Sequence, residues 1–310
     1  MEIVNTRVPM TWQLCWDTIR KLGEKYPFIR REVLTQTDGG RNVEVMAVGR
    51  GDRQVIFSGA HHANEWITAT LLLKFAEELA EAMATGGKLY GIPGDIFDRY
   101  ATVHIVPMVD PDGVDLVTGA IRPGTEAYGA AEKLAANYPR IPFPEGWKAN
   151  LNGVDLNLQY PAGWLQARQI KFGLGYTRPG PRDYVGRSPL DQKESAALAE
   201  YTARVDPALV LAYHTQGEVI YWQFRDHFVP GARELAEEFA RLSGYTPEDT
   251  PEESAYAGYK DWFIKYFRRP GFTVEVGKGE NPLPLSQFDR IYRENLGILT
   301  TGALGLPGGA

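Results

Sequence analysis

The sequence predicts an α/β fold in which helices flank a largely parallel or mixed β-sheet. Short apolar runs typical of buried strands recur along the chain, and segments with helical periodicity lie between them. No linker divides the chain, so residues 1–310 are expected to form a single domain. Hydrophobic residues make up 44% and charged residues 23%, which is the balance of a globular protein rather than a disordered one.

The N-terminal half begins with an amphipathic helix at 11–25, because Cys15, Ile19 and Leu22 fall on one helical face. Two strand-like runs follow at 28–36 and 43–49 around an Asp-Gly-Gly turn, which predicts a hairpin. The remaining elements expected in this half are a strand at 55–57, a helix at 66–85 and a strand at 102–109.

The segment 118–157 is rich in Gly and Pro and is expected to be a long surface excursion, with 118–150 a candidate lid over a substrate. Regular patterns resume beyond it. The expected elements are a helix near 190–205, a strand at 208–214, a helix at 231–243, a strand at 271–276 and a closing helix at 284–304.

Composition narrows the functional classes. The net charge of -6 disfavours nucleic-acid binding, which needs a basic surface. Cys15 is the only cysteine, which excludes an internal disulfide and a thiolate zinc cluster. The sequence shows neither a signal-peptide pattern nor a run of about 20 apolar residues, so we expect a soluble, cytoplasmic protein with no membrane partner. The oligomeric state is not predicted.

Two segments carry the pattern of a metal site. His62 and Glu65 form an H-x-x-E pair directly after one predicted strand, and His214 ends another. Sites in open α/β sheets gather at the carboxyl ends of strands. Two imidazoles and one carboxylate are the ligand set of a catalytic zinc, which keeps a position open for water. We therefore predict one Zn²⁺ per chain.

Each histidine also has a simpler interpretation, because an isolated histidine at a strand end is more often structural than a ligand. His61 adjoins the motif and is the alternative ligand, but the spacing to Glu65 favours His62. His104, within an apolar strand, and His227, in a polar loop, are expected to have no chemical role.

Glu275 lies within the apolar strand GFTVEV, where a carboxylate is costly unless it is paired or has a function. One interpretation is a strand-end glutamate that reaches water. The other is a catalytic base beside the metal, which takes a proton from water and passes it to the leaving amine.

At this point the chain resembles the zinc carboxypeptidase family. Five segments match in order: GAHHANEW at 59–66, DPDG at 110–113, NGVDLN at 152–157, the strand ending at His214, and FTVEV at 272–276. They extend over most of the chain. The resemblance implies a single domain with an eight-stranded mixed sheet flanked by helices. It also implies zinc ligands at the three positions named above and a general base at Glu275.

The resemblance extends to residues around the metal. Asp155 matches an aspartate that orients the first zinc histidine, and Asn157 matches an asparagine that helps to hold a substrate carboxylate. Lys148 stands where the family usually has an arginine that polarises the scissile carbonyl; a lysine supplies the charge from a single ammonium rather than a planar fork. A solvated loop lysine is the alternative.

Two positions depart from the family pattern. Leu158 replaces the arginine that grips a C-terminal carboxylate, which puts that mode of recognition in doubt. The family's mobile tyrosine has no clean match, and Tyr256 or Tyr259 are its candidate substitutes. Lys260 falls at the base of the specificity pocket, where it would favour an acidic side chain unless it is simply an exposed lysine.

The segments 147–164 and 268–289 resemble a bacterial branch, the γ-D-glutamyl-meso-diaminopimelate peptidases, which cut cell-wall peptides. This resemblance predicts a muropeptide as substrate and Lys260 as a partner for the side-chain carboxylate of diaminopimelate. Two alternatives stay open: a conventional carboxypeptidase, which Leu158 disfavours, and a non-catalytic muropeptide-binding protein, which the complete ligand set disfavours.

Overall fold

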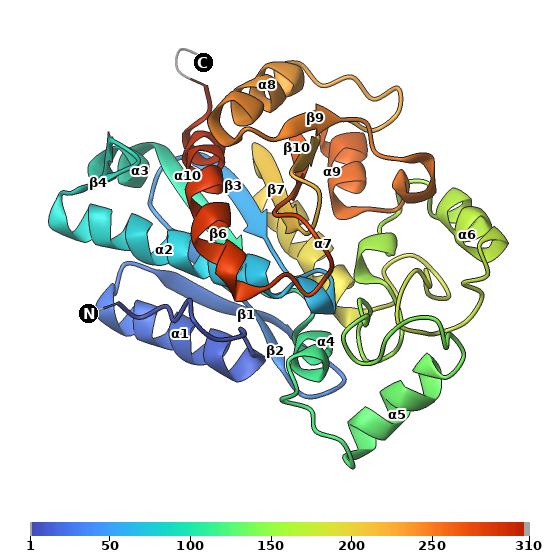
Figure 1. Ribbon diagram of the computed structural model, residues 1–310. Coiled ribbons are helices and arrows are strands. Elements are labelled where there is room, and N and C mark those ends of the chain that lie inside the picture. Colours follow the sequence, from blue (N-terminus) through green and yellow to red (C-terminus); the bar gives the residue numbers. More distant parts are fainter. Residues whose placement is uncertain (1, 307–310) are drawn as a thin grey trace.

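A mixed eight-stranded sheet forms the centre of the molecule, in the order β1-β2-β6-β3-β7-β10-β8-β9 (Figure 1). The computed structural model describes residues 2–306. The strands of this sheet are β1 (Arg30–Gln36), β2 (Asn42–Val48), β3 (Arg53–Ser58), β6 (Ala101–Val106), β7 (Leu209–His214), β8 (Val219–Tyr221), β9 (Thr246–Glu248) and β10 (Gly271–Glu275). A separate two-stranded hairpin consists of β4 (Lys88–Leu89) and β5 (Ile92–Pro93).

Helices cover both faces of the sheet (Figure 1). They are α1 (Trp12–Lys25), α2 (Ile67–Thr85), α3 (Gly94–Tyr100), α4 (Pro111–Val117), α5 (Glu126–Ala135), α6 (Trp164–Gly173), α7 (Lys193–Val205), α8 (Ala232–Ser243), α9 (Tyr259–Phe267) and α10 (Phe288–Leu304). Helices α1, α2, α3 and α10 pack in one apolar core, whereas α7 and α9 pack in the other.

The two cores follow from strand periodicity, because alternate side chains of a strand point to opposite faces. In β7, Leu209, Leu211 and Tyr213 belong to the first core, and Val210 and Ala212 belong to the second. A strand buried on both faces is a continuous apolar run, which is typical of the parallel part of a covered sheet.

The central strands place their carboxyl ends at one edge of the sheet. Strand β7 lies between β3 and β10 and is parallel to both. The chain after β3 leads to His62, β7 ends at His214, and β10 ends at Glu275. Residues more than 200 positions apart in the sequence therefore meet at this edge.

The predicted α/β class and mixed eight-stranded sheet are confirmed, and so are all the helices and strands named from the sequence, within a few residues at their ends. The prediction that 118–157 is a surface excursion was wrong in part. It contains α5, whose first turn is capped by the Thr125 hydroxyl, and Trp147 and Ala149 are buried against Leu116 and Ala131.

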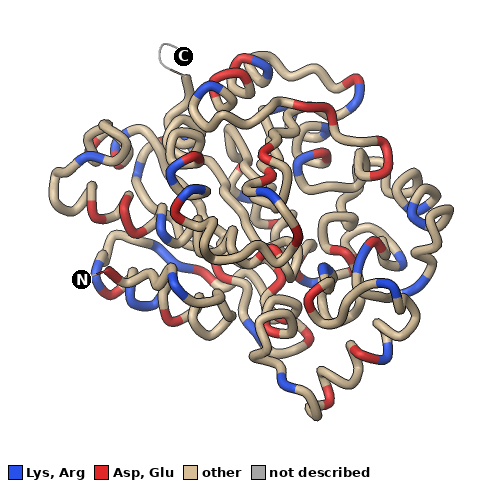
Figure 2. The backbone as a smooth tube through the Cα atoms, viewed as in Figure 1, with Lys and Arg blue, Asp and Glu red and all other residues tan. Residues whose placement is uncertain are grey.

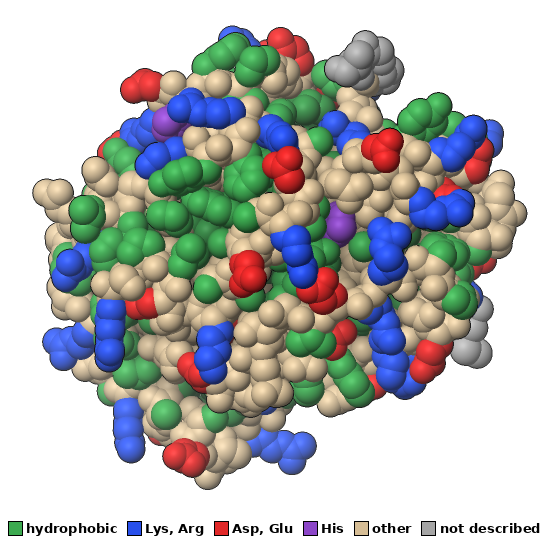
Figure 3. Space-filling view, turned by 180° about the vertical axis from the view of Figure 1, so that it is seen from behind, with side chains coloured by type: hydrophobic (Ala, Val, Ile, Leu, Met, Phe, Trp, Pro, Cys, Tyr) green, Lys and Arg blue, Asp and Glu red, His purple; other side chains and the backbone are tan. Residues whose placement is uncertain are grey.

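The surface carries both signs of charge on the same elements, without a continuous basic stripe in the view of Figure 2. Seen from behind, hydrophobic side chains form a broad area between scattered charged ones (Figure 3). Among the described helices, none combines the length and apolar character needed to cross a bilayer.

Candidate metal centre

A tight turn after β3 delivers His62 and Glu65 to the edge of the sheet. Ala60 has a φ of 45°, in the left-handed region that residues with a Cβ rarely adopt. The Thr68 hydroxyl stabilises this turn, because it accepts the Ala60 N–H at 2.8 Å and donates to the Glu65 carbonyl at 2.8 Å. Both ligand candidates are thereby fixed where the chain enters α2.

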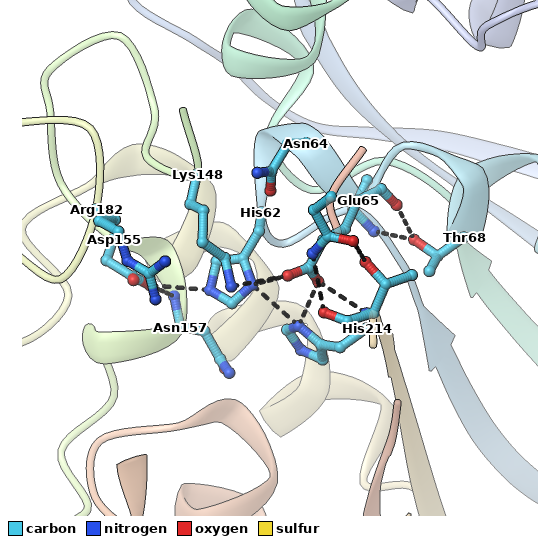
Figure 4. A network of polar contacts seen from close by, with 12 residues as sticks. His62, Asn64, Glu65, Thr68, Lys148, Asp155, Asn157, Arg182 and His214 are labelled. Atoms are coloured by element: carbon cyan, nitrogen blue, oxygen red, sulfur yellow. Dashed lines mark hydrogen bonds and ion pairs between the residues drawn. The ribbon is translucent and has the colours of Figure 1, made fainter. Parts of the chain in front are cut away.

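Three side chains from two segments converge, as the sequence predicted (Figure 4). His62 Nδ1 lies 3.0 Å from Glu65 Oε1, and His214 Nδ1 lies 3.0 Å from Glu65 Oε2. The two Nδ1 atoms are 3.1 Å apart. All three residues are buried.

This arrangement fits zinc. Tetrahedral ligands at about 2.0–2.1 Å from a zinc ion are separated from one another by roughly 3.3 Å. The two Nδ1 atoms are 3.1 Å from each other, and each is 3.0 Å from one oxygen of Glu65, which is close to that separation. Two imidazole nitrogens facing each other beside a buried carboxylate are unusual as a purely structural contact, because only one of the two nitrogens can donate to the other. A divalent cation would satisfy all three groups at once.

Asp155 fixes the orientation of His62. Its Oδ1 accepts from His62 Nε2 at 3.1 Å, which leaves Nδ1 free to face the metal position. Backbone N–H groups of Asn157 and Asp183 hold the carboxylate at 3.1 and 3.3 Å. Burial raises the pKa of Asp155, but the neighbouring charges of His62 and Lys148 outweigh burial and hold that pKa well below its usual value. Asp155 is therefore an ionised acceptor.

Lys148 brings a positive charge to the same place. Its Nζ lies 2.9 Å from Glu65 Oε1. Burial lowers the pKa of Lys148, but the charge of Glu65 outweighs burial and raises that pKa above its usual value, so the ammonium stays charged. The interpretation of Lys148 as a solvated loop lysine is wrong.

Glu275 is aligned with His214 across the parallel pair of β10 and β7. Paired residues of neighbouring strands point to the same face, so both side chains lie on one side of the sheet. Burial and the charge of Glu65 raise the pKa of Glu275 to about 8. A carboxylate with a raised pKa beside a metal site is suited to exchange protons near neutral pH.

The other histidines lie outside the cluster. His61 is buried, stacks on the His214 ring at a centroid distance of 5.5 Å, and contacts the Tyr160 hydroxyl at 3.5 Å. His104 bonds to Tyr201 of α7 and to Gln54 of β3, and His227 stacks on Phe224 in a loop.

Three further residues were expected near the substrate, and they lie in different surroundings: Asn157, Tyr259 and Tyr256. The side-chain oxygen of Asn157, Oδ1, accepts from the Tyr259 N–H at 3.0 Å. Tyr259 is buried, and its hydroxyl bonds to Thr202 at 2.7 Å. Tyr256 is partly exposed and packs against the Arg225 guanidinium, 4.2 Å from its ring. Of the two tyrosines, Tyr256 has the more accessible hydroxyl; it donates to Glu252 Oε1 at 3.4 Å, and a substrate would take the place of Glu252.

Lys260 is buried rather than exposed. Its ammonium contacts Asp261 Oδ1 at 2.5 Å, the Gln223 carbonyl at 2.7 Å and the Thr250 hydroxyl at 3.4 Å. The contacts with Gln223 and Thr250 are hydrogen bonds, and the contact with Asp261 is an ion pair. Asp261 already neutralises the charge of Lys260, and binding of a substrate carboxylate by Lys260 stays a prediction.

Sequence reasoning missed Arg182. It lies in a Gly- and Pro-rich stretch with no motif, far in sequence from both histidines. Figure 4 places it next to Asp155. The only signal in the sequence was an Arg-Asp pair in a loop that also contains Arg178 and Arg187, and such a pair is too common to identify a site.

The comparisons with known proteins agree with this geometry. A family model described as zinc carboxypeptidase matches residues 16–297. The chain is 40% identical over 301 residues to gamma-D-glutamyl-L-diamino acid endopeptidase 1 of Lysinibacillus sphaericus, covering 97% of this chain and 74% of that protein. It is 37% identical over 286 residues to an uncharacterized protein of Bacillus subtilis, covering 91% and 73%.

Among solved structures, thrombin activatable fibrinolysis inhibitor superposes with a TM-score of 0.75 at 17% identity, covering 97% of this chain and 76% of that one. At this level of sequence identity, the similarity shows a shared fold and nothing about function.

Proposed function

Because this chain belongs to the zinc carboxypeptidase family, we propose that it hydrolyses the bond between γ-D-glutamate and meso-diaminopimelate in bacterial cell-wall peptides. The relative from Lysinibacillus sphaericus, at 40% identity over nearly the whole chain, supports this substrate. The observation that carries the hydrolysis is the convergence of His62, Glu65 and His214 on one buried point.

In the proposed mechanism His62, Glu65 and His214 would hold the zinc ion, which would supply Lewis-acid activation of water and of the scissile carbonyl. Glu275 accepts the proton of the attacking water and delivers it to the leaving amine. The Lys148 ammonium, already beside Glu65, donates to the carbonyl oxygen as negative charge develops there.

Asp155 keeps His62 in the tautomer that presents Nδ1. The Asn157 amide nitrogen and the Tyr256 hydroxyl are proposed as donors to the bound peptide. A single domain over 1–310, a cytoplasmic location and the absence of a nucleic-acid partner stay predictions.

Product analysis tests the substrate. Zinc-loaded enzyme is incubated with L-Ala-γ-D-Glu-meso-diaminopimelate and, separately, with acyl-dipeptides that have ordinary α-peptide bonds, and the products are identified by mass spectrometry. We expect release of diaminopimelate from the first substrate. Faster cleavage of the dipeptides would instead identify a conventional carboxypeptidase, and binding of the tripeptide without turnover would identify a binding protein.

The variant Glu275→Gln tests the base. It removes the proton acceptor with little change in shape, so kcat should fall by about 10²- to 10⁴-fold. Zinc content, measured by elemental analysis, should stay near one ion per chain. Unchanged turnover in this variant would reject the proposed role of Glu275.

A further inference from the structure

The backbone around Arg182 is tied to both loops that supply the centre. The Pro181 carbonyl accepts from the N–H groups of Lys148 and Ala149 at 2.7 and 2.9 Å. On the other side of Arg182, the Asp183 N–H donates to Asp155 Oδ2. Arg182 is therefore held between Lys148, which contacts a ligand candidate, and Asp155, which contacts another.

The guanidinium is anchored at one edge only. Arg182 Nε donates to Asp183 Oδ2 at 2.5 Å, and the other oxygen of Asp183 accepts from the buried Lys171 at 2.5 Å. Within residues 2–306, neither Nη atom of Arg182 makes a hydrogen bond to the protein, and the side chain is 42% exposed. The fork of the guanidinium is oriented, and its outer edge is free to receive a ligand.

The charges of this region suit an anion. Arg182 and Lys148 are cations on adjoining segments, since the residue before Arg182 accepts from the Lys148 N–H at 2.7 Å. An anionic group between these two cations would relieve their repulsion.

Position 158, directly after Asn157, is a leucine and supplies no positive charge. The Leu158 side chain is buried and packs with Trp164 and Val185 in a small apolar cluster. By contrast, the side-chain amide nitrogen of Asn157 makes no hydrogen bond to the described part of the chain, because only its Oδ1 is engaged, as an acceptor from the Tyr259 N–H. The two residues are linked through Asp155, because its Oδ1 accepts from the Asn157 N–H and its Oδ2 accepts from the N–H of Asp183, the neighbour of Arg182. A guanidinium and a carboxamide with free donors thus belong to segments held by the same carboxylate.

We propose that Arg182 determines specificity by binding, with Asn157, a substrate carboxylate adjacent to the scissile bond. This inference rests on the proposed function, whose substrate has two such carboxylates: that of D-glutamate and that of diaminopimelate beside the released amine. The planar guanidinium would hold either one through two parallel hydrogen bonds, which a lysine cannot do.

The test compares wild type, Arg182→Gln and Arg182→Lys on three tripeptides. One is the free L-Ala-γ-D-Glu-meso-diaminopimelate, and the others carry a carboxamide in place of one of the two carboxylates. On the free tripeptide, Arg182→Gln should lower kcat/KM by about 10- to 150-fold, as expected for loss of hydrogen bonds to a charged group. Arg182→Lys should recover part of that loss.

The amidated substrates identify the carboxylate. One of the two amidated tripeptides lacks the carboxylate that Arg182 binds. On that tripeptide, kcat/KM of wild type should fall to the value of Arg182→Gln on the free tripeptide, and Arg182→Gln should lower it no further. Calorimetry measures the Kd of each tripeptide for the zinc-loaded variant Glu275→Gln and for the double variant that also carries Arg182→Gln. These Kd values should follow the same pattern as kcat/KM. Arg178, in the same loop, donates to Asn137, so Arg178→Gln is the matched control and should leave all values unchanged.

Equal losses on all three tripeptides, or no loss on any, would overturn the role of Arg182. If wild type cleaves none of them and Glu275→Gln binds none, the proposed function fails instead. Zinc content and the melting temperature of Arg182→Gln should match wild type, since Asp183 keeps its contact with Lys171.

Discussion

The pair of His62 and Asp155 decides which imidazole nitrogen faces the metal position. Asp155 is ionised and accepts from Nε2, so the lone pair of Nδ1 is directed toward Glu65 and His214. A carboxylate in this position also increases the basicity of the imidazole, which strengthens a bond to zinc. Metal affinity should therefore depend on a residue that is not itself a ligand.

The variant Asp155→Asn tests this dependence. An amide retains the size of the side chain but removes its charge, so zinc affinity should fall by about 10- to 100-fold. Competition with a fluorescent chelator measures the change. Asp110→Asn is the matched control, because Asp110 is equally buried but caps α4 through the Gly113 N–H. Equal affinities of wild type and Asp155→Asn would show that the contact does not tune the site.

Single residues also show where sequence reasoning succeeds and fails. His62, Glu65 and His214 could be identified because each follows or ends a strand, and carboxyl ends of parallel strands meet at one edge. Lys260 could not be placed, because a lysine between polar residues gives no sign that the chain buries it against Asp261 and Gln223. Arg182 was missed because its position depends on backbone contacts between irregular segments.

At the scale of elements, long segments with clear periodicity were predictable, whereas short ones were not. Helix α2 and strands β3, β7 and β10 have continuous apolar patterns. Strands β8 and β9 have three residues each, and their pairing with β10 and with each other is set by the sheet rather than by local sequence. Helix α5 was hidden within a Gly- and Pro-rich stretch.

Strand β6 carries a titratable group at the centre of the sheet. His104 Nδ1 lies 2.7 Å from the Tyr201 hydroxyl, and Nε2 lies 2.8 Å from Gln54 Oε1. Neutral histidine satisfies both contacts, since one nitrogen accepts and the other donates. Burial, reinforced by the charges of Arg30 and Arg204, lowers the pKa of His104 to about 4.

This shift predicts how stability depends on pH. Between pH 6.5 and about 4 the unfolded chain binds the His104 proton and the folded protein does not, so the free energy of unfolding falls as pH falls through this window. The contribution of His104 should decrease by roughly 2 kcal/mol from pH 8 to pH 5. Urea unfolding of wild type and His104→Gln at both pH values measures the difference. Identical pH dependence in the two proteins would contradict the prediction.

At the scale of the whole molecule, the metal cluster joins segments that the fold brings together from distant parts of the chain. His62 and Glu65 follow β3, His214 ends β7, and Lys148 comes from the loop between α5 and α6. An ion bound here exists only when these segments are assembled, because the unfolded chain does not hold the ligands together. Binding free energy therefore adds to the stability of the folded state.

Removal of zinc should consequently lower the melting temperature. At a thousandfold excess of zinc over its Kd the stabilisation is about 4 kcal/mol. At about 2 °C for each kcal/mol, chelation should lower Tm by roughly 8 °C. Scanning calorimetry with and without chelator, followed by zinc titration, measures the change and its dependence on zinc concentration. His214→Ala, which removes one ligand, should show a Tm that chelator does not alter; the same chelator-induced shift in this variant would mean that the ion stabilises the fold from another site.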